Sequence, residues 1–325
     1  MTAPRVPEHA VRRIVELATR APSVHNTQPW HWRSHGSHLE LYADRSRQLI
    51  ASDPDGRNLV ISCGTALHHA QVAADALGWR TRVDRLPDPD QPDLLARLRL
   101  SRRSPSPHAT EALDALERRC TDRRRFTSWP VPTERLTHLA AQASAWGARA
   151  LPIGDVSERF LAELLINRAV DAQRADPPVT REQQQWVDHG TRDGVPSVVL
   201  PRTGDATARR PSRFTTGLLG DIGGREVEAS DGLIVMYGTT DDVDTWLRTG
   251  EGLSALWLAA TTEGLSVVPL SQVVEVAATR EAMRLEVLGG LALPMIVVRI
   301  GWQAISRSQL PHTPRRPVAD LIDLT

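Results

Sequence analysis

The chain has 325 residues, of which 41% are apolar and 24% charged, so its composition is that of an ordinary globular protein rather than a disordered one. Its 39 basic and 39 acidic residues balance, which argues against a general attraction to nucleic acid or to an anionic membrane. Every basic residue counted there is arginine, and the absence of lysine excludes a Schiff-base enzyme, a Walker-type phosphate loop and a Ser-x-x-Lys acylating site. A bound phosphate must therefore be held by guanidinium groups, backbone N–H groups or hydroxyls.

The two cysteines, Cys63 and Cys120, lie far apart and lack metal-ligand spacing, which indicates a reducing compartment and no disulfide framework. Cys63 falls on the apolar side of a predicted helix, whereas Cys120 lies among arginines that could lower its thiol pKa. The N-terminus has no apolar signal core, and no apolar run is as long as a membrane span. We therefore expect a cytoplasmic protein whose partners are small molecules.

The first third of the chain alternates between helical and extended patterns. Apolar residues at helical spacing predict a helix over 7–20, and a longer one over 57–77 that ends at Gly78 in a left-handed conformation. Alternating apolar and polar residues predict strands over 39–42, 79–86 and 94–100.

The remaining two thirds repeat this alternation. Helices are predicted over 110–119, 132–146, 155–175, 241–262 and 279–288, and strands over 148–153, 232–237, 265–270 and 294–302. The segment 190–230 has little periodicity and is rich in Gly, Pro, Thr and Arg. Long irregular segments in compact domains are usually functional, so we interpret it as a lid-like loop over a pocket.

A polar turn follows the first helix, with the sequence Ala21-Pro22-Ser23-Val24-His25-Asn26-Thr27-Gln28-Pro29-Trp30. Pro22 ends the helix and Pro29 holds Gln28 extended. Asn and Gln each present an acceptor and two donors, so together they can bind the edge of a flat heterocycle. The alternative is a turn that only caps and connects, which is the common fate of such a loop.

Two further stretches accompany this turn, 53–64 (Asp-Pro-Asp-Gly-Arg-Asn-Leu-Val-Ile-Ser-Cys-Gly) and 118–126 (Arg-Arg-Cys-Thr-Asp-Arg-Arg-Arg-Phe). Together with the Ser-x-x-Asn-x-Gln-Pro-Trp turn, they resemble the FMN-dependent nitroreductase superfamily, in particular its actinobacterial Acg-type branch. The resemblance covers nearly the whole chain. It implies an α+β nitroreductase-like fold with central, mostly antiparallel sheets flanked by helices.

The chain also resembles two nitroreductase units fused into pseudo-symmetric lobes, which we place at 1–105 and 106–325. Both predicted long helices end in Ala-Ala-x-x-x-Gly before an extended run, at 73–78 and at 259–264. Nitroreductases are usually homodimers with flavin at the subunit interface, and only the first lobe here has the polar turn. The resemblance therefore implies one FMN per chain between the lobes, in a monomer or a weak homodimer.

The resemblance also implies the residues that hold FMN. For the phosphate, Arg124 matches best by its spacing from Phe126, Arg123 is next, Arg119 lies earlier in the loop, and Arg315 and Arg316 precede Pro317 near the C-terminus. For the ring, the turn offers Ser23, Asn26 and Gln28, while His25 takes a position usually held by a small residue and is interpreted mainly as filling the turn. On the reactive side we expect backbone groups near Gly264 and Leu265, with Pro269 and Leu270 under the ring.

Three other signals do not support a site. The stretch 250–255 (Gly-Glu-Gly-Leu-Ser-Ala) matches a loose dinucleotide motif but lies in a helical segment, without the strand that such a motif requires. The histidines at 31, 35, 38, 68 and 69 lack paired metal-ligand spacing, and the aspartates at 88, 90 and 93 are explained by turn formation, so we predict no metal site.

The favoured hypothesis is an FMN-binding oxidoreductase in which NAD(P)H passes hydride to FMN and a nitroaromatic or quinone-like acceptor then takes the electrons. In such an enzyme the cofactor carries the chemistry, so the lack of a catalytic triad is no objection and we name no catalytic residue. The alternative is a flavin-storage, sequestration or stress protein with little turnover, because a closed lid would keep both nicotinamide and acceptor from the ring.

Overall fold

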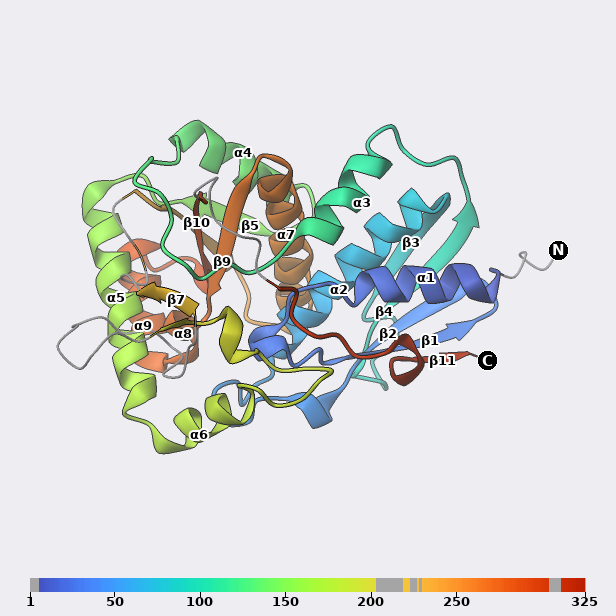
Figure 1. Ribbon diagram of the computed structural model, residues 1–325, viewed down its shortest axis with the longest axis horizontal. Coiled ribbons are helices and arrows are strands. Elements are labelled where there is room, and N and C mark those ends of the chain that lie inside the picture. The colour runs from blue at the N-terminus through green and yellow to red at the C-terminus, as the bar shows by residue number, and fades with distance from the viewer. Residues whose placement is uncertain (1–5, 203–218, 223–226, 228–229, 304–310, 325) are drawn as a thin grey trace.

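The computed structural model describes residues 6–202, 219–222, 227, 230–303 and 311–324, so much of the predicted lid at 190–230 falls outside the described residues. Figure 1 shows a β-sheet at each end of the molecule, with the long helices α2 and α7 between them. None of the described helices is long and apolar enough to cross a membrane.

The first sheet has the strand order β11-β1-β2-β4-β3. Its members are β1 (Trp30–His35), β2 (His38–Ala43), β3 (Trp79–Arg85), β4 (Leu94–Arg102) and β11 (Ile322–Leu324). Only the β1–β11 pair is parallel, and the other neighbours are antiparallel. Helices α1 (Glu8–Ala18) and α2 (Arg57–Ala76) bury their apolar residues in the core that also contains Trp30 and Trp32 of β1.

The second sheet has the order β5-β8-β10-β9 and is antiparallel throughout. Its strands are β5 (Arg149–Pro152), β8 (Gly232–Gly238), β9 (Leu265–Leu270) and β10 (Leu293–Trp302). One face packs into the core shared with α7 (Val243–Thr262) and α4 (Thr133–Ser144). The other face packs into a second core with α5 (Val156–Arg174), α8 (Gln272–Glu275) and the segment 283–287 that continues α9 (Ala277–Ala282).

The two sheets share one plan, which confirms the predicted α+β fold of two pseudo-symmetric lobes. In chain order, β1, β2, α2, β3 and β4 of the first sheet correspond to β5, β8, α7, β9 and β10 of the second, with the same neighbours in each sheet. Both long helices have 20 residues, and each is followed by a glycine with positive φ, Gly78 and Gly264, directly before an edge strand. The predicted boundary at residue 105 remains a prediction, and the C-terminal β11 returns to the first sheet.

The helices α2 and α7 cross where equivalent residues meet. An alanine-type Cβ at Gly64 would lie 2.2 Å from the Leu247 carbonyl oxygen, and one at Gly250 would lie 2.0 Å from the Ile61 oxygen. The His68 Nδ1 lies 2.7 Å from Ser254 Oγ, 186 positions later in the chain. The same offset relates Gly64 to Gly250 and Gly78 to Gly264, so residues contact their own counterparts, as they do at the two-fold axis of a symmetric dimer.

This crossing explains the glycine-rich stretch at 250–255, which lies inside α7. Gly250 allows the close approach of α2, and a Cβ at Gly252 would lie 2.4 Å from that of Ala148. The stretch is a helix-packing motif, in agreement with its rejection as a dinucleotide site.

Several elements were not predicted from the sequence. These are β1, β11, the short α8, and α6 (Pro177–Gln185), together with short 3-10 segments and the strands β6 (Pro201–Arg202) and β7 (Leu219–Ile222). The predicted helix 279–288 is divided into α9 and a π-helical turn, Met283–Val287. Helix α3 (Ala109–Arg118) was predicted to within one residue at each end.

Candidate cofactor-binding site

The polar turn at 21–30 has a strained backbone. His25, Asn26 and Gln28 have φ values of +48°, +55° and +51°, in the left-handed region where residues other than glycine are uncommon. Each such residue costs about 1–2 kcal/mol and persists only where surrounding contacts require it. Here the Gln28 N–H donates to Ser23 Oγ at 2.9 Å and the Val24 N–H donates to Ser62 Oγ at 3.2 Å. Such strain is a mark of functional turns.

A cavity of about 430 Å³ opens beside this turn. Its wall is built by four segments: the end of α1 with the turn, the loop after α3, residues near 195–199, and the C-terminal segment 311–318. Six of the residues predicted to hold the cofactor line it, namely Ser23, Asn26, Arg119, Arg123, Arg315 and Arg316. The structure thus joins the turn, the arginine loop and the C-terminal arginines in one place.

Two arginines of the cavity wall, Arg119 and Arg315, have buried guanidinium nitrogens and no carboxylate partner among the described residues. Arg119 is 5% exposed, and its Nη2 donates to the Arg20 carbonyl oxygen at 2.9 Å. Arg315 Nη2 donates to the same oxygen at 3.3 Å. Within the described part of the chain, Nε and Nη1 of Arg119 and Nε of Arg315 are buried without a hydrogen-bond partner.

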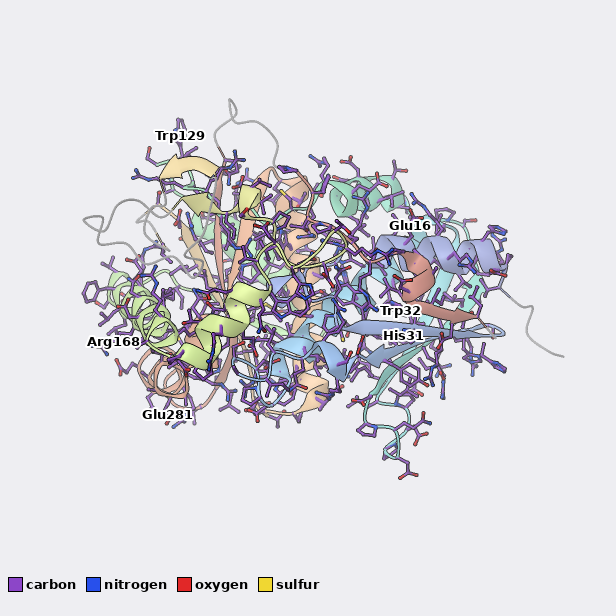
Figure 2. All side chains as sticks on the ribbon, turned by 60° about the horizontal axis from the view of Figure 1, so that its bottom comes forward. Glu16, His31, Trp32, Trp129, Arg168 and Glu281 are labelled. Carbon is purple, nitrogen blue, oxygen red and sulfur yellow. The ribbon has the colours of Figure 1, made fainter. Side chains whose placement is uncertain are left out.

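Burial lowers the pKa of Arg119 to about 10. Burial, followed by the charges of Arg119 and Arg20, lowers the pKa of Arg315 to about 9. Partial burial and the same three arginines lower the pKa of His312, which also lines the wall. The acid in this wall, Glu16 (labelled in Figure 2), already pairs with Arg13 at 2.8 Å. The cavity is therefore positively charged and has unused N–H donors, which suits an anion.

The two carboxamides of the turn are bound by other segments of the chain. Asn26 Nδ2 donates to the carbonyl oxygens of Gly194 (2.8 Å) and Pro314 (3.0 Å), and its Oδ1 accepts from Arg315 Nη1 at 2.8 Å. Gln28 Nε2 donates to the Arg192 oxygen at 3.0 Å, and its Oε1 accepts from the Arg316 N–H at 2.9 Å. We name residues 186–199 the strap, because they cross the turn.

The strap is anchored by a cluster of charged and aromatic side chains. The Asp193 carboxylate accepts from Arg47 and from His189 Nδ1, and both Arg47 and Asp193 are largely buried. His189 stacks on Trp186 with ring centroids 4.5 Å apart, and Arg47 lies over the same indole. Desolvation opposes ionisation of Asp193, but the bonds from His189 and Arg47 outweigh it and lower its pKa. The contacts of Asp193 with Arg47 and His189, which we name the latch, therefore hold the strap against the turn.

The other predicted site residues lie elsewhere. The Arg124 guanidinium is buried against the Asp122 carboxylate, with Nη2 2.6 Å from Oδ2, so the structure favours Arg119 and Arg123 over Arg124 as wall residues of the cavity. Gln28 lies behind the wall and His25 is 4% exposed. Gly264, Leu265, Pro269 and Leu270 lie at and along β9 and are not in the cavity wall, so their contact with a ring remains a prediction.

Both cysteines have a thiol pKa raised by burial. Cys63 is fully buried and donates to the Pro29 oxygen at 3.1 Å, as expected for a core residue. Cys120 lines the cavity beside Arg119, but desolvation outweighs the arginines, so the suggestion that they lower its pKa was wrong.

Arg20 and His312 were not predicted as parts of the site, nor was the beginning of the strap, 186–189; the rest of the strap falls within the segment predicted as a lid-like loop over a pocket. Arg20 is the last residue before the turn motif, and its basic side chain was the available signal. Its main contribution is its backbone oxygen, which positions both Arg119 and Arg315 and has no signature in sequence.

No protein-family model matches the chain. A Mycobacterium tuberculosis protein named "Putative NAD(P)H nitroreductase" is 38% identical over 316 residues, covering 96% of this chain and 91% of the relative. Another protein from that organism, with the same name and the suffix acg, is 31% identical over 323 residues and covers 96% of this chain. The chain belongs to the NAD(P)H nitroreductase family. This confirms the predicted family and its Acg-type branch, and places the chain among oxidoreductases.

Solved nitroreductases share a more distant likeness. A protein from Anabaena variabilis described as a "putative nitroreductase" has a TM-score of 0.48 and 11% identity, covering 91% of this chain and 88% of that protein. A Bacteroides fragilis nitroreductase with bound FMN has a TM-score of 0.41 and 13% identity, covering 63% of this chain and 95% of that protein. Because these scores are below 0.5, the family assignment depends on the sequence relatives alone.

Proposed function

We propose that this nitroreductase-family protein binds FMN and oxidises NAD(P)H, passing the electrons to a nitroaromatic or quinone-like acceptor. The observation that carries the proposal is the buried Arg119 guanidinium, which has two nitrogens without a partner in the described part of the chain and lies beside Arg315 and the strained turn. When bound, FMN supplies the hydride and electron chemistry, and the protein supplies binding, orientation and a dry environment.

The residues present fit the phosphate end of FMN. Arg119 and Arg315 would donate to its oxygens with the three buried nitrogens that have no partner in the described chain. Arg123 contributes a third guanidinium from the same wall. Without an anion, two adjacent buried cations destabilise each other, so a doubly charged phosphate removes that cost as well as forming charge-assisted bonds.

The isoalloxazine end would use Ser23, Asn26 and Gln28. In the structure, both carboxamides form hydrogen bonds with backbone groups of the strap and of residues 314–316. We propose that the ring takes over some of these hydrogen bonds when FMN binds. We also propose one FMN per chain between the lobes, in a monomer or weak homodimer, because the cavity already takes wall residues from both predicted lobes.

The phosphate contact is tested by comparing FMN with riboflavin, which lacks the phosphate. Arg119→Gln and Arg315→Gln should each weaken FMN binding by at least about 10-fold, as expected for a lost charge-assisted bond, and change riboflavin binding less than about 2-fold. Flavin fluorescence quenching during titration of apoprotein measures both. Arg12→Gln, at an exposed pair on α1, is the control. Equal losses for the two flavins, or no FMN binding by the wild type, would contradict the proposal.

Catalysis is tested separately by anaerobic mixing of the FMN-loaded protein with NADH or NADPH. Loss of the oxidised-flavin absorbance, followed by its return on addition of a nitroaromatic or a quinone, is the expected result. Flavin that stays bound and oxidised with both nucleotides would refute the reductase activity while leaving FMN binding intact.

One observation favours a second candidate function, flavin storage with little turnover. The strap occupies Asn26 and Gln28 and is latched through Asp193, so a closed strap would shield bound flavin from nucleotide and acceptor. Asp193→Asn weakens the latch, because the amide cannot hold Arg47 and His189 as an anion does. Under this hypothesis the variant should release FMN faster and be reduced faster by NADPH. Unchanged rates in both assays would count against a shielding role.

A further inference from the structure

On the solvent-facing side of the first sheet, two neighbouring rows of side chains run across the strands and differ in charge. The first, which we name the basic row, runs across β1, β2, β4 and β3 and consists of His35, His38, Arg99 and Arg82. The second, the balanced row, consists of Arg33, Glu40, Arg97 and Asp84. In Figure 2 the label His31 marks β1, the strand that also carries Arg33 and His35.

Carboxylates neutralise the balanced row, whereas the two arginines of the basic row, Arg99 and Arg82, have no carboxylate partner within the described residues. Arg97 Nε lies 2.7 Å from Glu40, and Arg33 lies 3.6 Å from Asp323 of β11. In the basic row, Arg99 Nε donates to the ring nitrogen Nε2 of His38 at 3.3 Å, so its partner is a neutral ring. Partial burial, then Arg99 and Arg97, lower the pKa of His38. In the described part of the chain, Arg82 has neither an ion pair nor a hydrogen bond.

Neighbouring strands lie about 4.8 Å apart, so Arg99 and Arg82 face each other as a directly opposed pair of like charges. Such pairs of like charge destabilise a sheet. The two side chains line a groove of about 400 Å³ together with His38, Val83, Asp84 and Arg97. A multivalent anion in this groove would relieve the repulsion.

In the second lobe, a buried carboxylate neutralises Arg299, the arginine that corresponds to Arg99. By the offset that relates α2 to α7, Arg82 corresponds to Val268, and the strand registers then pair Arg82 with Arg99 and Val268 with Arg299. Arg299 is 3% exposed, and its Nε lies 2.7 Å from the buried Asp231 carboxylate. In the first lobe the counterpart Arg99 is exposed and has no ion-pair partner among the described residues, so an anion can reach it from solution.

We propose that the basic row binds a small oligophosphate, a ligand with two or more linked phosphate groups. Guanidinium forks bind phosphate oxygens in pairs, and His38 adds a ring nitrogen at the side of the groove. The neutral net charge of the chain, with Asp84 and Glu40 in the adjacent row, favours a compact ligand over a long polyanion.

The test is a calorimetric titration of the intact protein with inorganic tripolyphosphate at low ionic strength. Saturable binding is expected for the wild type, and at least a 10-fold loss of affinity for Arg82→Gln and for Arg99→Gln. Arg33→Gln is the matched control, because it makes the same charge change on the same face in the balanced row. It should change the affinity less than about 2-fold. Circular dichroism checks that the variants remain folded.

Two further titrations distinguish the basic row from binding in the interlobe cavity and from general binding of polyanions. Arg119→Gln removes a guanidinium from the interlobe cavity, which also suits an anion, so it should keep the component of binding that Arg82→Gln and Arg99→Gln weaken; loss of that component would overturn the assignment. A single-stranded oligonucleotide should bind more weakly than tripolyphosphate. Tighter oligonucleotide binding that depends on Arg82 and Arg99, an equal loss in Arg33→Gln, or no saturable binding would also refute the proposal.

Discussion

The two lobes of this protein have the same strand order and the same helix-glycine-strand succession, but they differ in the connections between those elements. In the first lobe, β1 and β2 are joined by a tight hairpin, Gly36 and Ser37, and residues 19–29 connect α1 to β1. In the second lobe the link between α4 and β5 is short, and the long connection, 153–231, lies between β5 and β8.

The connections 19–29 and 153–231 meet at the candidate site. The α1–β1 connection provides the strained turn, and the β5–β8 connection provides the strap that binds Asn26 and Gln28 of that turn. A shared scaffold thus builds both cores, whereas the site is made from the segments in which the lobes differ, as is usual for function carried on loops. The charges differ as well: the buried Arg119 beside the site has no carboxylate partner among the described residues, whereas the buried Arg299 of β10 pairs with Asp231.

The difference between Arg299 and Arg119 is tested most directly by replacing each arginine with methionine. Arg299→Met should cost about 3–5 kcal/mol of unfolding free energy, because it leaves the Asp231 carboxylate buried without its cation. Arg119→Met should instead raise the stability of the apoprotein by about 1 kcal/mol, because it removes a buried charge that has no counterion among the described residues. Urea denaturation of flavin-free protein measures both. Destabilisation of the same size in the two variants would show that Arg119 is already neutralised.

A second prediction concerns the helix crossing that relates the lobes. Gly250→Ala should lower the free energy of unfolding by about 3 kcal/mol, because the new methyl group would lie 2.0 Å from the Ile61 oxygen and the helices must separate. Gly154→Ala is the control, since a Cβ there has nothing within 4 Å; it should change stability by less than about 0.5 kcal/mol. Similar urea midpoints for the two variants would contradict close packing at the crossing.

The third and smallest effect distinguishes the carboxylates at the starts of α2 and α7. Asp53 accepts from the N–H groups of Asn58 and Leu59, and burial raises its pKa to about 7. Asp242 accepts from the Thr245 N–H, and that bond lowers its pKa. Between about pH 4 and pH 7 the folded protein therefore holds a proton at Asp53 that the unfolded chain has lost, so this carboxylate makes stability fall as the pH rises. Asp242 acts in the opposite direction: its contribution is present above its unfolded pKa, near 4, and is lost as the pH falls below it.

The measurement is the urea midpoint as a function of pH. Asp53→Asn should remove the decline in stability between pH 4 and pH 7. Asp242→Asn should leave that interval unchanged and reduce the loss of stability below pH 4. An unchanged profile for Asp53→Asn would show that this carboxyl group stays ionised throughout.

Much of the secondary structure was predictable because its signals are local. The helix α2 was predicted to within one residue, since its apolar spacing, the Asp-Pro-Asp-Gly turn before it and Gly78 after it lie within one stretch of sequence. The strand β11 was missed because three residues carry too little pattern, and its pairing with β1 joins positions about 290 apart. Helix α6 was missed because its sequence is mostly polar.

The candidate site likewise has features that local sequence predicts and features that depend on distant residues. The sequence by itself determined that a polar turn, an arginine loop and two C-terminal arginines were present, because residue types and short spacings carry that information. Only the tertiary structure decided that Arg119 and Arg123 line the cavity while Arg124 pairs with Asp122, and that the strap binds the carboxamides of the turn. Which side chain keeps an unused donor depends on partners contributed by distant segments, and the balance of burial and charge exists only after those segments have packed together.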